Sequence, residues 1–233
     1  SRVAEFFQKK KHEVICNFYR RPIKVKNIKK IKLNITKKIL IKEKIDAIIH
    51  CASKTHINCE KDLTIYEQNI KMMKNLLDLA KQKKIKKFIF LSSVSAYGKI
   101  NNNLLYENDK PINPNPYGKS KIFCENLLSN FSKENEDFKS IAIRLPGTVG
   151  FGSHGNFISD ITKKILVGKE IKISNKSSYF NNIIFVDDLS NFLLTLLKRK
   201  KFKYDFINIA SNRKMKIMNV VNFIYSRLNK KKI

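Results

Sequence analysis

The sequence predicts an α/β protein built on a doubly wound parallel sheet, with a smaller mixed part toward its end. Short apolar runs of strand length alternate with longer segments whose apolar residues recur at helical spacing. The short runs are compact and apolar, as expected for strands buried on both faces. With 233 residues, 42% of them hydrophobic, the chain can bury a sizeable core.

The first part of the chain supplies most of the expected sheet. In chain order the expected elements are a helix in AEFFQKKK, strands in HEVICNF (12–18) and DAIIHCAS (46–53), a helix in TIYEQNIKMMKNLLDLAKQ, a strand in KKFIFLSS, a helix over about 117–131 and a strand in SIAIRLPG. The first long helix repeats apolar or semi-apolar positions at 65, 69, 72, 73, 76, 77 and 80, so one of its faces is expected to turn inward. Pro146 and Gly147 end the last of these strands.

From about residue 146 the pattern changes to a smaller mixed continuation. It reads as a glycine-rich loop, GTVGFGSHGNF, a helix in ISDITKKILVGK, a strand running into a helix in NNIIFVDDLSNFLLTLLKR, and a strand in FINIAS. We therefore expect two parts, residues 1–145 and residues 146–233. Ligands of such sheets bind outside the carboxyl ends of the strands.

The formal net charge of +29 is spread along the whole chain. Its densest run, KVKNIKKIKLNITKKILIKEK, carries isoleucines interleaved at strand and helix spacings. We interpret the charge as solvated lysine faces on a globular protein. Binding to polyanions is expected at low salt, and no specific nucleic-acid partner is expected.

Targeting signals, apolar runs and cysteines indicate the cellular compartment in which the protein is expected. No run approaches the roughly 18 apolar residues of a membrane span, and SRVAEFFQKKK lacks the apolar core of a secretory signal. We therefore expect no membrane span and a cytoplasmic location. The cysteines, Cys16, Cys51, Cys59 and Cys124, show no CxxC spacing, which predicts reduced thiols rather than a metal site or disulfides.

The stretch PNPYGKSK, residues 114–121, places Tyr117 four residues before Lys121. Two prolines prevent helix before the tyrosine, so Tyr117 is expected on a first helical turn with Lys121 one turn later on the same face. A free phenol has a pKa of about 10. A neighbouring ammonium lowers this pKa and makes the phenol a usable acid or base. The spacing alone is common, and most often means a packed ring and a solvated amine.

Further motifs accompany this pair in a fixed order. LSSVSAYG ends a predicted strand, so Ser92 or Ser93 is expected at a carboxyl edge. With these motifs the chain resembles the extended short-chain dehydrogenase/reductases of the NAD-dependent epimerase/dehydratase family, which are nucleotide-sugar epimerases, dehydratases and 4-ketoreductases. The segments that carry the resemblance are HEVICNFYRR, DAIIHCAS, YEQNIKMMKNLL, FIFLSSVSAYG, PNPYGKSK, IAIRLPGTVGFG and IIFVDDL.

The resemblance implies a Rossmann-like dinucleotide-binding domain over residues 1–145 and a substrate-binding part over residues 146–233. It gives Tyr117 the role of catalytic acid/base, Lys121 the tasks of lowering the tyrosine pKa and holding the nicotinamide ribose, and Ser93 a hydrogen bond to the reacting oxygen. The further residues that it implies at the cofactor are Arg20, Arg21, Ala52, Ser53 and Asn69. Asn156 falls where the family contacts the substrate diphosphate, although a loop-capping asparagine is as good an interpretation.

Several departures from the family pattern narrow the function. Val94 and Ser95 stand where family dehydratases carry an acidic pair, which disfavours elimination of water. Asn181 replaces an arginine that often precedes the late strand, which weakens assignment of a particular nucleotide. The acidic residue that would bind a ribose hydroxyl is absent at the second family strand, and Arg20 and Arg21 follow it. Arginines at that edge suit a 2'-phosphate, so we expect NADP in preference to NAD.

The first family strand and its glycine loop, GxxGxxG, have no counterpart in the sequence. SRVAEFF resembles the helix that follows those glycines, and KIMNVVNFIYSRLNKKKI resembles a penultimate helix. The chain is therefore expected to be either a fragment of a longer product or a degenerate family member.

Our interpretation of the sequence is an NAD(P)-dependent epimerase or 4-ketoreductase of a nucleotide-diphosphate sugar, acting at C4. The sequence does not distinguish these two activities. A non-catalytic family member that binds a nucleotide sugar or a polyanion is the alternative, and a homodimer is left open.

Overall fold

The computed structural model describes residues 2–20, 22–54, 64–101, 104–153, 155–202 and 205–230. They form two compact units, of which the first comprises Ser1–Leu145 and Ser190–Asn208 and the second Pro146–Leu189 and Ile209–Ile233. The sequence placed everything after residue 145 in one part. Residues 190–208 instead belong to the first unit, because the strand near their end pairs with that unit's sheet.

Four parallel strands form the centre of the first unit, in the order β3-β4-β5-β9. Their bounds are Ala47–His50 for β3, Lys87–Ser93 for β4, Lys139–Leu145 for β5 and Phe206–Asn208 for β9. His50, the last residue of β3, pairs with Phe90, so β4 continues past it through Leu91 and Ser92 to Ser93. The end of β4 therefore projects at the carboxyl edge of the sheet.

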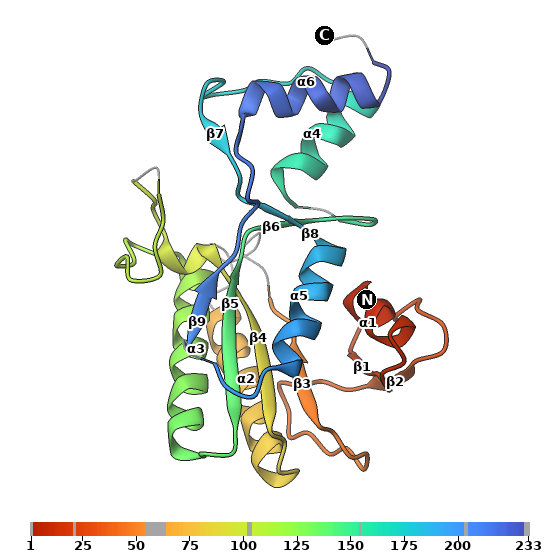
Figure 1. The fold of residues 1–233 in the computed structure, drawn as a ribbon, viewed down its shortest axis with the longest axis vertical. Helices are drawn as coiled ribbons and strands as arrows, with labels where there is room; N and C mark the ends of the chain where they lie inside the picture. Colours follow the sequence, from red (N-terminus) through yellow and green to blue (C-terminus); the bar gives the residue numbers. More distant parts are fainter. Residues whose placement is uncertain are drawn as a thin grey trace. The chain divides into compact units, whose positions relative to one another are not determined.

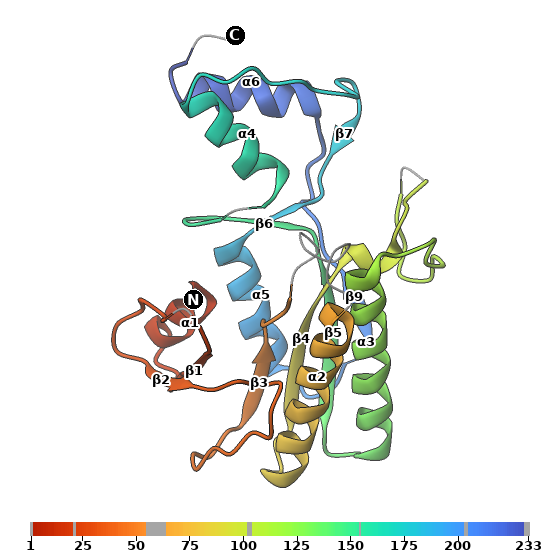
Figure 2. The ribbon, with the colours of Figure 1, turned by 180° about the vertical axis from the view of Figure 1, so that it is seen from behind.

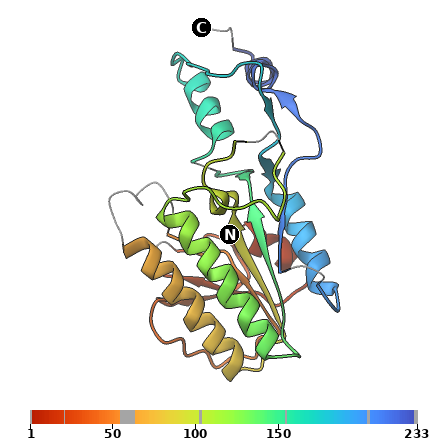
Figure 3. The ribbon, with the colours of Figure 1, turned by 90° about the vertical axis from the view of Figure 1, so that its left-hand side faces the viewer.

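Helices cover both faces of this sheet (Figures 2 and 3). Helices α2 (Thr64–Gln82) and α3 (Pro116–Glu134) lie side by side on one face, and α5 (Val186–Lys198) lies on the other. The apolar faces of α2 and α3 and the strand residues form the core, whose fully buried members include Met73, Phe88, Phe90 and Leu128. This packing follows from the helical period of α2 and the continuous apolar runs of the strands.

A second parallel pair, β1 (Ile15–Phe18) and β2 (Lys29–Lys32), follows α1 (Arg2–Lys9). Figure 1 shows this pair beyond β3, at the end of the sheet away from β9. Within the described residues, no strand pairing joins it to β3. Strand β2 was not expected, because its sequence, KKIK, exposes three lysines and turns a single isoleucine inward.

The described residues of the second unit form short strands and helical segments. Its strands are β6 (Gly147–Val149) paired with β8 (Ile183–Phe185), and β7 (Tyr179–Phe180) paired with β10 (Met215–Lys216). Helices α4 (Phe157–Leu166) and α6 (Ile217–Arg227) share a small core around Ile161, Ile165, Val221 and Tyr225. The segment GTVGFGSHGNF was expected to be a loop throughout. Its first residues instead form β6, because they find hydrogen-bonding partners in β8.

No described helix is long and apolar enough to cross a membrane.

The core between α3 and the sheet yields a first prediction. Leu128 is 1% exposed, whereas Leu40 is 76% exposed. Leu128→Ala should lower the free energy of unfolding by about 2–5 kcal/mol, since it leaves a cavity in packed surroundings. Leu40→Ala, the matched control, should cost less than about 0.5 kcal/mol. Urea unfolding measures both, and equal costs would contradict the observed burial.

Candidate functional site

The end of β4 turns directly into a short 3-10 helix, η2 (Val94–Tyr97). Ser93 caps it: its Oγ accepts from the backbone N–H of Ser95 at 3.1 Å and lies 3.1 Å from the Ser95 Oγ, to which it donates. We call residues 93–97 the serine turn. Its hydroxyls lie half-buried at the carboxyl edge of the sheet.

Helix α3 begins against the serine turn. Asn115 caps the helix by accepting from the N–H of Gly118 at 2.8 Å, and Pro116 occupies the first position, where its missing N–H costs nothing. A Cβ on Gly118 would overlap the carbonyl of Ser95, far closer than the 3.0 Å that real Cβ atoms keep. Glycine therefore lets the turn that carries Tyr117 touch the turn that carries Ser93.

Lys121 follows Tyr117 on the same face of α3 and is buried. Its Nζ donates to the carbonyl of Leu91 on β4 at 2.9 Å and lies 5.3 Å from the centre of the Tyr117 ring and 4.6 Å from that of Phe90. Burial disfavours its charge and lowers the pKa of Lys121 to about 8. The amine is thus mostly protonated at neutral pH and fixed beneath the phenol ring.

His50 is a buried neighbour of Lys121. It is 5% exposed, stacks on Phe90 with ring centres 5.4 Å apart, and ends strand β3. Burial, together with the positive charge of Lys121, lowers the pKa of His50 to about 3. The imidazole is therefore neutral at physiological pH, and the ammonium faces no second cation from this side.

Asn69 on α2 connects this helix to two other segments around the site, the loop after β3 and the start of α3. Its Oδ1 accepts from the N–H of Lys54 at 2.9 Å, and its Nδ2 donates to the Lys54 carbonyl at 3.3 Å and to the Ser120 Oγ at 3.0 Å. Ser120 in turn donates to the carbonyl of Tyr117 at 2.7 Å. The buried amide thus ties the loop after β3 to the first turns of α3.

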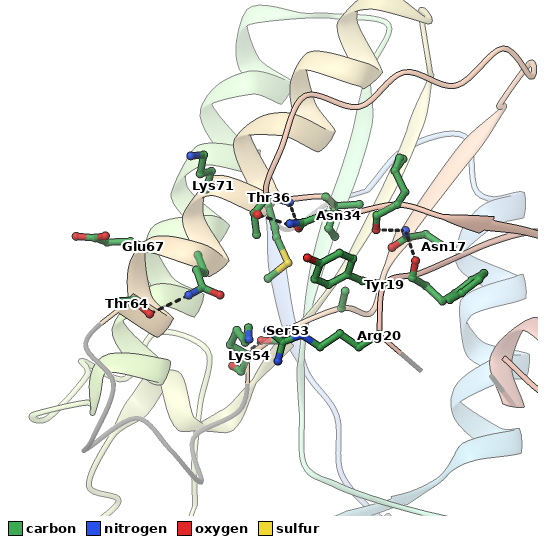
Figure 4. Close-up of a pocket in the computed structure, with 16 residues that line it drawn as sticks. Asn17, Tyr19, Arg20, Asn34, Thr36, Ser53, Lys54, Thr64, Glu67 and Lys71 are labelled. Atoms are coloured by element: carbon green, nitrogen blue, oxygen red, sulfur yellow. Dashed lines mark hydrogen bonds between the residues drawn. The ribbon is translucent and has the colours of Figure 1, made fainter. Parts of the chain in front are cut away.

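A pocket of about 620 Å³ opens at the carboxyl ends of β1 and β3 (Figure 4). Its walls come from residues 17–20 after β1, 33–36 after β2, 52–54 after β3 and the first turns of α2. Ala52 and Ser53 lie in this wall. The small side chain of Ala52 leaves the backbone accessible there.

The lining of this pocket carries more positive than negative charge. Among the described residues that line it, Arg20, Lys54 and Lys71 are cationic and Glu67 is the one carboxylate. The Arg20 guanidinium lies 5.9 Å from the centre of the Tyr19 ring. Arg21 lies outside the described residues. Such a lining favours an anionic ligand.

Asn156 lies in the second unit and caps helix α4. Its Oδ1 accepts from the N–H of Ser159 at 3.0 Å, and its Nδ2 donates to the carbonyl of Thr148 at 3.1 Å. Both ends of the amide are thus engaged in local structure, as the capping interpretation of this residue expects.

The sequence missed the buried polar residues behind the site. These are His50, Glu125 and Arg144, each at most 6% exposed. One signal was available for Glu125, since it follows Lys121 by one helical turn. Among the described residues there is no group of three or more His, Cys, Asp or Glu that could hold a metal ion.

Comparison with known proteins assigns the chain to a family. The sequence model of the NAD dependent epimerase/dehydratase family matches residues 1–210. The chain belongs to this family. Among its relatives, the UDP-glucose 4-epimerase of Lactobacillus helveticus is 33% identical over 129 residues, which are 54% of this chain and 38% of that protein.

A second relative covers more of this chain. It is the N-acetyl-alpha-D-glucosaminyl-diphospho-ditrans,octacis-undecaprenol 4-epimerase of Escherichia coli O157:H7, 26% identical over 189 residues, which are 80% of this chain and 56% of that protein. The chain thus spans less than two thirds of the length of either relative.

Solved structures establish the fold. MoeE5 in complex with UDP-glucuronic acid and NAD superimposes with a TM-score of 0.85 at 18% identity, covering 99% of this chain and 79% of that chain. UDP-glucose 4-epimerase from Thermotoga maritima, with UDP-glucose, gives 0.82 at 19% identity, covering 100% and 80%. The Rossmann-like α/β fold expected from the sequence is confirmed.

The burial of Lys121 yields a prediction of pH dependence. Its pKa is about 8 in the folded protein and 10.5 ordinarily, so between these values the unfolded chain holds the extra proton and stability rises with pH. Relative to Lys121→Met, the parent should gain about 2 kcal/mol of unfolding free energy between pH 7.5 and pH 10. Urea unfolding of both proteins at the two pH values tests this, and a constant difference would contradict a buried amine.

Proposed function

We propose that the protein is an NAD(P)-dependent enzyme that epimerises a nucleotide-diphosphate sugar at C4 or reduces a ketone there. The observation that supports this most is the packing of the first turn of α3 on the serine turn. Through it the turn that carries Tyr117, with the Lys121 ammonium 5.3 Å from the centre of its ring, packs on the turn that carries Ser93. Ligands of doubly wound sheets bind at this edge. The relatives named above act on nucleotide-linked or lipid-linked sugars, which favours the same substrate class.

The position and charge of the pocket favour the adenosine end of a dinucleotide. It lies at the carboxyl ends of β1 and β3, and its lining is cationic. Arg20, Ala52 and Ser53 would hold the adenosine end, and Tyr117 and Lys121 the nicotinamide ribose, with Asn69 supporting the wall between them. When bound, a nicotinamide dinucleotide supplies a hydride acceptor or donor for the sugar carbon.

Residues of this chain would accept the proton of the sugar hydroxyl and donate it back. Tyr117 accepts this proton during oxidation of the alcohol and returns it during reduction of the ketone. The ammonium of Lys121 beneath the ring stabilises the phenolate form of Tyr117, so less free energy is needed to form the base that accepts the proton. Ser93, whose hydroxyl is oriented by Ser95, would hydrogen-bond the reacting oxygen. This scheme needs no metal ligand.

Preference for NADP is part of the proposal. Arg20 follows β1 in the pocket wall, and Asn17 at the end of β1 uses its amide to donate to the carbonyl of Leu33 at 2.8 Å. No carboxylate among the described residues at this end of β1 lines the pocket, so a 2'-phosphate would meet a cation rather than an anion. A cofactor released after each turnover, as expected with NADP, favours the reductase, and a retained NAD favours the epimerase.

Three further parts of the proposal concern the cellular compartment, the oligomeric state and the substrate diphosphate. Cys16, Cys51 and Cys124 are free, which fits a reducing, cytoplasmic compartment. A homodimer is a further proposal; Tyr66 on α2 and Phe123 on α3 form an aromatic pair, and Phe123 is 40% exposed. Asn156 would reach a substrate diphosphate only by giving up one of its capping contacts.

Replacing Tyr117 tests the acid/base role. Tyr117→Phe should leave the dissociation constant for the dinucleotide within about twofold of the parent and lower turnover about 10²–10⁴-fold, because the ring stays and the proton carrier is lost. Tyr106→Phe, on an exposed tyrosine, is the matched control. Fluorescence titration and a coupled assay measure the two quantities. Parent-like turnover of Tyr117→Phe would remove the assignment.

Replacing Arg20 tests the 2'-phosphate argument. Arg20→Ala should weaken NADPH binding about tenfold or more, and NADH binding little, because a charge-assisted contact to the 2'-phosphate is lost. Arg213→Ala, on an exposed arginine of the second unit, controls for the general effect of lowering the net charge. Equal weakening of the two dinucleotides by Arg20→Ala would contradict the preference.

A further inference from the structure

A buried ion pair lies directly behind the candidate site. Arg144 on β5 donates from Nε to Glu125 Oε1 at 3.0 Å and from Nη2 to Oε2 at 2.7 Å, and both side chains are 5% exposed. Removing two charges from water is costly, and apolar residues of similar volume often serve stability equally well. Stability is therefore a weak reason for a pair at this place.

Both partners of the pair are fixed from several sides. Ser92 on β4 donates its hydroxyl to Glu125 Oε1 at 2.5 Å. The guanidinium of Arg144 lies between two rings, 4.4 Å from the centre of Tyr97 and 3.8 Å from that of Phe206. Burial opposes its charge, but the hydrogen bonds and charge of Glu125 outweigh this effect and raise the pKa of Arg144. The Glu125 carboxylate and the Arg144 guanidinium are thus each held in one orientation.

The position of the pair relates it to the site. Glu125 follows Lys121 by one turn of α3, and Tyr117 precedes Lys121 by one turn, so the three share one face. Ser92 directly precedes Ser93 and pairs with Arg144 in the register of β4 and β5. The residues of β4 and β5 that hold the Glu125 carboxylate therefore lie next to the serine turn along the sheet.

We propose that Glu125 and Arg144 are positioning residues that set the height and rotation of α3 against β4 and β5. The bidentate contact fixes the helix at one level, and that level brings Tyr117 and Lys121 to Ser93. The catalytic consequence rests on the proposed function, whereas the fixing of the helix does not.

A charge-neutral double variant separates positioning from stability. Glu125→Gln/Arg144→Met removes both charges, keeps their volume and leaves an acceptor for Ser92. Its urea midpoint should stay close to that of the parent. Backbone amides in residues 117–125 should exchange with deuterium at least about tenfold faster, while those of β4 stay protected. Turnover should fall about 10²-fold with KM within about threefold, since small misplacements at a reacting centre have effects of this size.

Two further variants complete the experiment. Lys29→Met/Glu43→Gln removes an exposed ion pair in the first unit and should change neither exchange in α3 nor turnover. Arg144→Lys keeps a buried cation but loses the fork, and should show the same changes as the double variant to a smaller degree. It decides the question if the double variant does not fold.

Parent-like exchange in residues 117–125, in whichever of the two variants at Arg144 is folded, would overturn the proposal. Faster exchange with parent-like turnover would overturn its catalytic part. A parent protein that binds no dinucleotide and turns over no nucleotide sugar would count against the proposed function, and the exchange measurement would still decide whether the pair positions α3.

Discussion

The candidate site depends on one close approach, that of the first turn of α3 to the serine turn. The approach exists because Gly118 has no Cβ where the carbonyl of Ser95 lies. Tyr117 precedes this contact by one residue, and Lys121 follows it by less than one turn of helix. A separation of the two turns by the width of one methyl group would move the turn that carries Tyr117 away from the turn that carries Ser93. The chemistry proposed for the protein is therefore limited by backbone packing, and only afterwards by the choice of catalytic side chains.

Burial of charge at the site follows from the same packing. Lys121 gains a carbonyl partner and two ring faces in place of water, and its pKa falls to about 8 as a result. The nearby Cys124, Glu125 and Cys51 limit this fall in pKa by favouring the charged amine, and the neutral His50 adds no cation from β3. A lysine in this state is still charged at neutral pH but is only weakly solvated, and its electrostatic effect on a neighbouring phenol is correspondingly large.

Elements with a strong local signal were predictable from the sequence. Strands β3, β4 and β5 are compact apolar runs, α2 has a clear helical period, and proline marks the start of α3. Strand β2 was missed because three of its four residues are lysines, where a buried strand would normally carry apolar residues. Strand β6 was missed because its three residues pair with β8, which lies far along the chain. The pair Glu125 and Arg144 was missed for a related reason, since its contact joins a helix to a strand and no spacing in the sequence records it.

The two parallel sheets of the first unit have a consequence for ligand binding. The pocket takes part of its wall from the β1–β2 sheet and part from β3 and α2, and among the described strands no ladder of backbone hydrogen bonds joins these walls. A ligand that contacts both walls adds a cross-link that the fold itself does not provide. Its binding free energy therefore goes partly into docking the N-terminal sheet. In such a protein, saturation with ligand should protect residues 2–36 from proteolysis more than it protects the central sheet.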